Sequence, residues 1–182
     1  MKRRDFVKLS ALGSAAVLAK SCSTSSDKKQ VPILETSKKI KVVSTWISGI
    51  DANKEAIRIL SSNGSAITAV EKGLNVTESD PNNTSVGFGG MPDASGVVTL
   101  DASIMDDQYN CGSVTYLQNI EHPISVARKV MEETPHVMLS GKGAYDFAIE
   151  QGFTHKNLLT ESSLQKWQEW KKDNSFNLPH IN

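Results

Sequence analysis

Cysteine is the rarest residue in this 182-residue chain, which contains only Cys22 and Cys111. So few cysteines exclude the disulfide framework that stabilises many small exported proteins. Cys111 is therefore expected to be a small buried hydrophobic residue. Aromatic residues are also scarce, at 6% of the chain, while hydrophobic residues account for 38%. This content suffices for one modest domain or for part of a larger one.

The chain has no excess charge of either sign, because 20 Lys and Arg residues balance 20 Asp and Glu residues. A dedicated nucleic-acid-binding protein would carry a basic stripe, so no nucleic-acid partner is predicted. The chain has four histidines, His122, His136, His155 and His180. Their positions share no metal-ligand spacing, and no metal site is predicted from them.

A long apolar run is missing as well. The apolar stretch from Leu9 to Ala19 is too short to span a bilayer. It follows a basic start with paired arginines, and residues 1–22 together predict an export signal that resembles the twin-arginine type. Cys22 ends a stretch that resembles a lipoprotein cleavage box, which predicts lipidation of Cys22 and a periplasmic or cell-envelope location. The alternative is an ordinary signal with an incidental cysteine.

Residues 23–39 are rich in Ser and Lys and predict a flexible linker, so the folded part is expected to span residues 40–182. Apolar periodicities predict a buried strand at 40–45, helices at 51–62 and 66–78, a hairpin of strands at 97–105 and 111–116, a helix from 123, a strand at 136–140, a helix at 142–152 and a helix from 162. This order predicts an α+β or mixed α/β fold. Four short strands are few for so many helices, so the chain resembles half of a fold.

Local signals predict where several helices begin and end. Asp51 is the expected N-cap of the first helix, and Gly64 its stop. Val70 and Leu74 belong to the apolar stripe expected to pack the second helix. Ser162 is expected to open the last helix as part of a capping box.

The glycine-rich loop at 84–96 contains Gly87, Gly89 and Gly90. Its G-x-G-G spacing, with no Lys-Ser or Lys-Thr pair behind it, argues against a phosphate site. The loop needs glycine either for turns of positive φ or for close approach of its backbone to a ligand or to another chain segment. Asp101, in the middle of the following strand, is expected to be held by structural hydrogen bonds.

Trp46 lies in the stretch KVVSTWISG (41–49), at the end of the first predicted strand. The residues alone leave open whether Trp46 packs in the core or lines a site. No set of nucleophile, base and orienting group can be assembled from the sequence. Composition and pattern therefore indicate an exported α/β domain and go no further.

Six stretches together resemble the N-terminal (α-subunit) half of the glycosylasparaginase family of N-terminal-nucleophile hydrolases. They are STW (44–46), AVEKGLNVTESDP (69–81), SVGFGGMPD (85–93), VTLDASIMD (98–106), HPISVARKVME (122–132) and TPHVMLSGKGAYDFAIEQGF (134–153). The wider plant-type asparaginase superfamily shares several of them. STW favours the glycosylasparaginase branch, because the asparaginase branch usually has a His-Gly-Gly type loop at that place.

The resemblance implies a four-layer αββα sandwich of the N-terminal-nucleophile hydrolase type, incomplete in this chain. Precursors of the family cleave themselves before a threonine in a His-Asp-Thr-Ile-Gly stretch, which would fall downstream of residues 180–182. The threonine is then nucleophile and, through its α-amino group, base. No catalytic residue is therefore expected here, and this chain alone is expected to be inactive. The implied substrate is glycosylated asparagine, the implied partner is the β-subunit half of the same precursor, and no metal or organic cofactor is implied.

Two residues of the chain match site positions of the family. Trp46 matches the tryptophan that borders the substrate pocket, and Ser85 matches the serine that opens the glycine loop near that pocket. Two alternatives stay open. One is an isoaspartyl peptidase or L-asparaginase of the same superfamily, and the other is a truncated, non-catalytic envelope lipoprotein.

Overall fold

The computed structural model describes residues 39–172. The predicted export signal (1–22), the predicted lipidation site Cys22 and most of the predicted linker (23–39) lie outside the described residues. The described part contains α2 (Gly49–Ser61), α3 (Ala66–Glu78), β1 (Leu100–Met105), β2 (Cys111–Leu117), α4 (Pro123–Glu133), β3 (Leu139–Ser140), α5 (Gly141–Glu150) and α6 (Glu161–Lys172). It is an α+β fold, as the sequence predicted.

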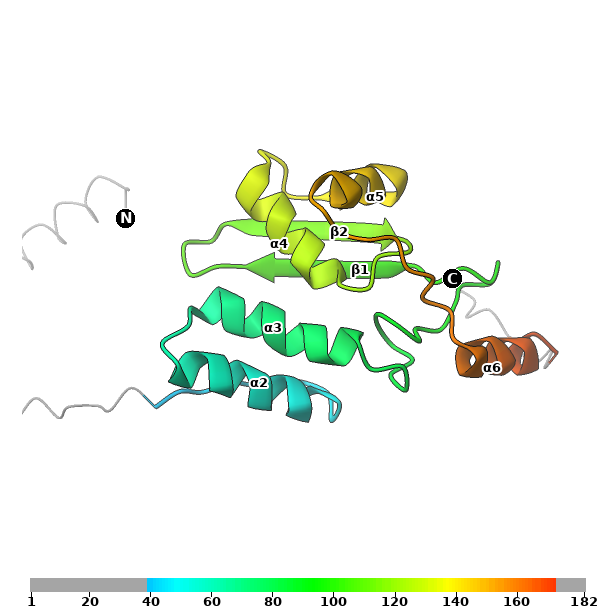
Figure 1. Cartoon of the computed structure of the whole chain (residues 1–182), viewed down its shortest axis with the longest axis horizontal. Coiled ribbons are helices and arrows are strands. Elements are labelled where there is room, and N and C mark those ends of the chain that lie inside the picture. Colours follow the sequence, from blue (N-terminus) through cyan, green and yellow to red (C-terminus); the bar gives the residue numbers. More distant parts are fainter. Residues whose placement is uncertain (1–38, 173–182) are drawn as a thin grey trace, which may run out of the picture. The chain divides into compact units, whose positions relative to one another are not determined.

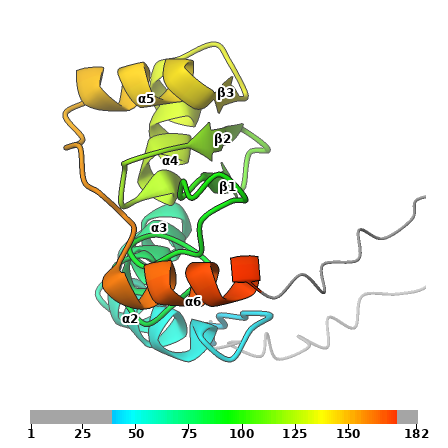
Figure 2. The same ribbon diagram turned by 90° about the vertical axis from the view of Figure 1, so that its right-hand side faces the viewer.

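The three strands form one sheet in the order β1-β2-β3, in which β1 and β2 are antiparallel and β2 and β3 are parallel. Figure 2 shows α4 on one face of the β1–β2 hairpin and no helix of the described residues on the opposite face. Helix α3 packs between α4 and α2, and α2 lies on the far side of α3 from the sheet (Figure 1). Among residues 39–172, helices thus cover one face of the sheet only.

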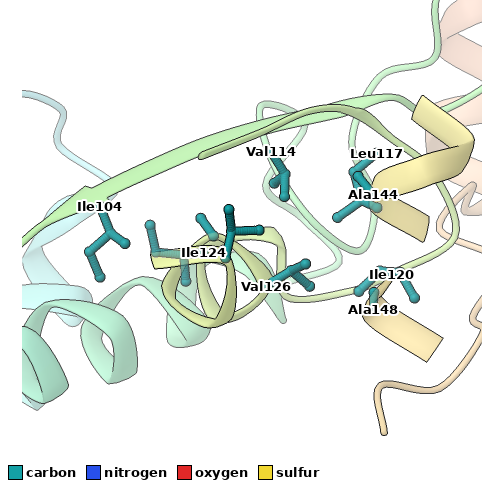
Figure 3. Close-up of a cluster of buried hydrophobic side chains, with 10 residues drawn as sticks. Ile104, Val114, Leu117, Ile120, Ile124, Val126, Ala144 and Ala148 are labelled. Atoms are coloured by element: carbon teal, nitrogen blue, oxygen red, sulfur yellow. The ribbon is translucent and has the colours of Figure 1, made fainter. Parts of the chain in front are cut away.

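The predicted hairpin is confirmed, and its alternation explains the core. Ile104 is buried in the main cluster with residues of α4, and Leu100 is buried in a second cluster with Val98 and Leu158, while Asp101 and Met105 are exposed. Figure 3 shows the main cluster, in which side chains of β1 and β2 meet those of α4 and α5. Its buried members are Ile104, Val114, Leu117, Ile120, Ile124, Val126, Ala127, Val130, Ala144 and Ala148. Each larger aliphatic side chain removed from water there contributes about 1.5–3 kcal/mol.

Helix α4 begins at Pro123, as predicted. Proline is favourable at this first helical position because its backbone N–H would have no partner within the helix. Helix α2 begins at Gly49, two residues before the predicted cap, so Asp51 lies in its first turn and not at its N-cap. At its end, Asn63 adopts a positive φ of 61°, one residue before the predicted stop, Gly64. The N–H of Gly64 bonds to Ile59 O at 2.9 Å, and that of Asn63 to Leu60 O at 3.1 Å. This is a Schellman ending with Asn in the left-handed position.

The predicted strand at 40–45 is wrong for the described residues. That segment forms no strand, and Val43 is 90% exposed. An extended segment becomes a strand only where a neighbour pairs with its backbone groups, and no other segment in 39–172 pairs with this one. The strand predicted at 136–140 is real but shorter, since β3 contains only Leu139 and Ser140.

Two further expectations are corrected. Val70 and Leu74 are partly exposed, at 46% and 38%, because α3 lies between α2 and α4 and turns Ala69 and Gly73 inward instead. The cap of α6 is Thr160, not Ser162. Thr160 Oγ1 accepts a hydrogen bond from Ser163 N at 3.3 Å, three positions into the helix.

Candidate functional site

A pocket of about 570 Å³ lies over helices α2 and α3. Its wall consists of residues 42–49, of side chains from both helices, and of Asn83, Ser85 and Val86 from the start of the glycine loop. The two residues that the sequence singled out, Trp46 and Ser85, therefore line the same pocket, although they are far apart along the chain.

Trp46 is 80% exposed, which excludes a core position for it in the described residues. The turn that carries it is held in two places. Gly49 N donates to Trp46 O at 2.9 Å, and Ser44 Oγ donates to Asn53 Oδ1 on α2 at 2.6 Å. These bonds place the indole at the rim of the pocket.

Ser85 follows an Asn side chain that shapes the loop. Asn83 Oδ1 accepts from Ser85 N at 2.9 Å, and Thr84 O accepts from Met91 N at 2.9 Å. Gly87, with φ of 64°, lies so close to the backbone of Glu78 that a Cβ would approach Glu78 O to 2.0 Å. Both expected uses of glycine, positive φ and close approach to another chain segment, are confirmed here.

The side chains of the pocket wall can form hydrogen bonds and apolar contacts. The wall offers hydroxyls, amides, aliphatic side chains and one indole, and none of its residues is ionisable. Such a wall can hold and orient a ligand. It supplies neither a general base nor an activated nucleophile.

A second polar group, between α3 and α4, was not predicted. Glu71 is buried, and its carboxylate accepts from Ser125 Oγ at 2.6 Å and from Arg128 Nη1 at 2.8 Å. Arg128 also donates to Glu132 at 2.7 Å and to Thr68 Oγ1 at 3.1 Å. The sequence signal is a set of polar residues at helical spacing on α3, Glu71, Asn75 and Glu78, facing others on α4. It is easily missed because charged residues are usually solvent-exposed.

Electrostatics in this group follow from burial and hydrogen bonding together. Burial raises the pKa of Glu71, but the hydrogen bonds from Ser125 and Arg128 outweigh burial, and the pKa lies below its ordinary value. Desolvation lowers the pKa of Arg128, but the bonds to Glu132 and Glu71 raise it above its ordinary value. Both groups are therefore held in their charged forms.

The remaining carboxylates of interest are also held by hydrogen bonds. Glu78 is buried and accepts from Ile124 N, at the start of α4, at 3.0 Å, and its other oxygen lies 3.1 Å from His122 Nδ1. Asp101 accepts from Thr115 Oγ1 at 2.7 Å and from Tyr116 N at 2.8 Å, so its predicted structural role is confirmed. The bonds from Thr115 and Tyr116 lower the pKa of Asp101.

Some features concern only the part of the chain that the structure describes. Cys111 is a free thiol and half-buried, where full burial was expected. No group of three or more His, Cys, Asp or Glu residues in 39–172 could hold a metal ion. No helix in the same range combines the length and the hydropathy needed to span a membrane.

Comparisons with known proteins identify relatives of the whole described region. A family model described as Asparaginase matches residues 30–179. An N(4)-(beta-N-acetylglucosaminyl)-L-asparaginase from Elizabethkingia miricola is 49% identical over 179 residues, which is 96% of this chain and 51% of that protein. The rat protein of the same name is 43% identical over 134 residues, 73% of this chain and 39% of that protein. A plant-type L-asparaginase from Pyrococcus horikoshii is 42% identical over 110 residues, 60% of this chain and 36% of that protein.

The chain thus spans about half the length of the first of these relatives, or less than that for the others. The family match covers most of the chain and includes every described element and both lining residues, Trp46 and Ser85. The chain belongs to the asparaginase family.

Proposed function

We propose that this chain is the α-subunit part of an amidohydrolase that cleaves the amide bond between N-acetylglucosamine and asparagine. The observation that carries the proposal is the pocket in which Trp46 and Ser85 meet with no ionisable residue beside them. A site of this kind binds substrate but depends on another chain segment for its nucleophile. The names of the relatives from Elizabethkingia miricola and rat support this choice of substrate.

The nucleophile in this proposal is a threonine downstream of residue 182, freed by self-cleavage of a precursor. Its α-amino group takes the proton of its own hydroxyl, which attacks the side-chain amide carbonyl of the glycosylated asparagine. Hydrogen-bond donors stabilise the tetrahedral intermediate. The α-ammonium group returns this proton to the amide nitrogen as the C–N bond breaks, so the amino sugar leaves as a neutral amine and a β-aspartyl ester of the threonine remains. Water then hydrolyses the ester, which frees the threonine hydroxyl and releases aspartate.

The proposed partner is the β-subunit half of the same precursor, which would complete an αββα sandwich. Two structural facts support it. One face of the sheet carries no helix in the described residues (Figure 2), and residues 40–45 have the pattern of a strand without a pairing neighbour. A second sheet contributed by the β-subunit half could pack on that face and form the second β layer of the sandwich.

Location is a further part of the proposal. Residues 1–22 direct export by a twin-arginine-like signal, and lipidation of Cys22 would attach the protein to the membrane of the cell envelope. Metabolic labelling with a fatty acid, compared between the native protein and Cys22→Ser, tests the attachment. Label retained in the variant would contradict it.

The activity is tested on the complete gene product that contains this chain. We expect release of aspartate from glycosylated asparagine, and none from the chain ending at Asn182. Trp46→Ala should raise KM about tenfold, the effect of losing a substrate contact, with kcat much less affected. Because Trp46 is 80% exposed, its removal should change the free energy of unfolding by no more than about 0.5 kcal/mol.

Val137→Ala is the matched control, since Val137 is 62% exposed and does not line the pocket. Faster turnover of β-aspartyl dipeptides or of free asparagine than of glycosylated asparagine would favour the alternative, an isoaspartyl peptidase or L-asparaginase. The similarity to a plant-type L-asparaginase is the reason to test this alternative. Loss of soluble protein in Trp46→Ala, with no separable kinetic effect, would contradict the substrate contact and give Trp46 a role in stability instead.

A further inference from the structure

The glycine loop that carries Ser85 is held from its far side by a segment late in the chain. Both backbone polar groups of Gly89 bond to this segment. Gly89 N donates to Leu158 O at 2.9 Å, and Gly89 O accepts from the hydroxyl of Ser163 on α6. Leu158 and Ser163 are each 1% exposed, so these bonds are shielded from water.

One more contact fastens the same segment to the loop, and a hydrogen bond inside the segment orients Ser163. The ammonium group of Lys156 lies over the ring of Phe88, 4.1 Å from its centroid, and also pairs with Glu121 at 2.8 Å. Thr160 caps α6 and bonds to the Ser163 hydroxyl at 3.2 Å, which fixes where that hydroxyl points. The segment 156–163, which we call the loop clamp, therefore contacts the loop at two successive residues.

The loop transmits its position from Gly89 to Ser85 because it is closed at its base. Met91 N bonds to Thr84 O at 2.9 Å, and Phe88 N bonds to Glu78 O at 2.7 Å. Met91 lies two residues after Gly89, so a shift of Gly89 that carries Met91 with it would also move Thr84 and its neighbour Ser85, which forms part of the pocket wall. Ser163 itself does not line the pocket.

We propose that Ser163 is a positioning residue that sets the place of Ser85 in the pocket wall through Gly89. This inference rests on the proposed function, since it assigns the pocket to substrate binding. Ser163→Ala places a good helix former in α6 and removes the buried hydroxyl that donates a hydrogen bond to Gly89 O. The glycine loop is then held less firmly against the loop clamp. The proposed catalytic threonine, downstream of residue 182, is not changed.

The kinetic test uses the complete gene product with glycosylated asparagine as substrate. Ser163→Ala should raise KM about fivefold, the factor associated with one lost hydrogen bond, and leave kcat within about twofold. A residue needed only for stability would lower the active fraction, and so the apparent kcat, without moving KM. Ser162→Ala is the matched control, because Ser162 is its exposed neighbour on α6. An unchanged KM in Ser163→Ala overturns the proposal.

A second pair of variants decides the matter if Ser163→Ala does not fold. Lys156→Met removes the cation over Phe88 and keeps the apolar stem, and it should raise KM about twofold, a typical exposed cation–π effect. Glu121→Gln removes the ion pair with Lys156 but leaves the cation in place. The proposal fails if both variants change KM equally or if neither does.

Hydrogen–deuterium exchange separates this inference from the proposed function. If the wild-type product does not hydrolyse glycosylated asparagine, the proposed function fails. The clamp is then judged by amide exchange in residues 84–91, which should be faster in Ser163→Ala than in wild type and unchanged in Ser162→Ala. Equal exchange in all three proteins would overturn the clamp itself.

Discussion

At the scale of single residues, the Glu71 carboxylate between α3 and α4 gives a testable prediction about stability. It is buried and accepts from Ser125 and Arg128. Glu71→Gln loses the charge that faces Arg128, and we expect the free energy of unfolding at pH 7 to fall by about 1–3 kcal/mol. Urea unfolding of the two proteins measures this difference. Glu133→Gln is the control, because Glu133 pairs with Lys129 with its side chain 48% exposed, and such pairs contribute little.

The same residue gives a pH dependence with a defined sign. The pKa of Glu71 in the folded protein lies below its ordinary value, and a glutamate in an unfolded chain titrates near about 4.3. Between the two values the unfolded chain binds more protons, so stability rises with pH there. The contribution of Glu71 is complete above the unfolded pKa and is lost as the pH falls through the folded one. The gap between wild type and Glu71→Gln should therefore narrow below about pH 4; a constant gap would refute the charged form of Glu71.

At the scale of elements, the start of α6 offers a sharp comparison. The sequence pointed to Ser162 as the cap, whereas Thr160 makes the bond to Ser163 N. Thr160→Ala should cost about 1 kcal/mol of stability, as loss of an N-cap usually does. Ser162→Ala should cost much less, because Ser162 is exposed in the first turn. Thermal unfolding of the two variants distinguishes the caps, and an equal or larger loss in Ser162→Ala would contradict the structure.

Elements whose signals are local were predictable, and those that depend on distant partners were not. The hairpin followed from strict alternation around Leu100 and Ile104, and α4 from Pro123 at its first position. The strand at 40–45 has the same apolar signal but lacks a pairing neighbour within 39–172. Periodicity reports which face of a segment is apolar and says nothing of whether a partner is present.

The site shows the same division. The sequence selected Trp46 and Ser85 by family resemblance, and the structure brings both to one pocket. The role of Ser163 could not be predicted from the sequence, because a serine on a helix is ordinarily exposed and its bond to Gly89 joins residues far apart in the chain. Contacts of that kind are set by tertiary packing, which no local pattern encodes.

At the scale of the whole molecule, several exposed apolar side chains lie around the pocket, and the proposed β-subunit half would cover them. Val43 and Ile47 are 90% and 84% exposed, beside Trp46. Patches of this kind on a soluble chain favour association. We expect the chain ending at Asn182 to bind the dye ANS and to self-associate as its concentration rises, and the complete gene product to do neither.

The control for this prediction changes the surface without changing the core. Val43→Thr combined with Ile47→Thr should reduce both dye binding and association, since both side chains are exposed apolar groups at the pocket. Val137→Thr, at an exposed position outside the pocket lining, should leave both unchanged. Sedimentation velocity over a range of concentrations measures the association. A chain that stays monomeric, binds no dye and unfolds cooperatively would show that residues 40–47 need no cover. This outcome would favour the non-catalytic lipoprotein over half of an amidohydrolase, because a complete fold leaves no segment with unpaired strand-forming backbone groups.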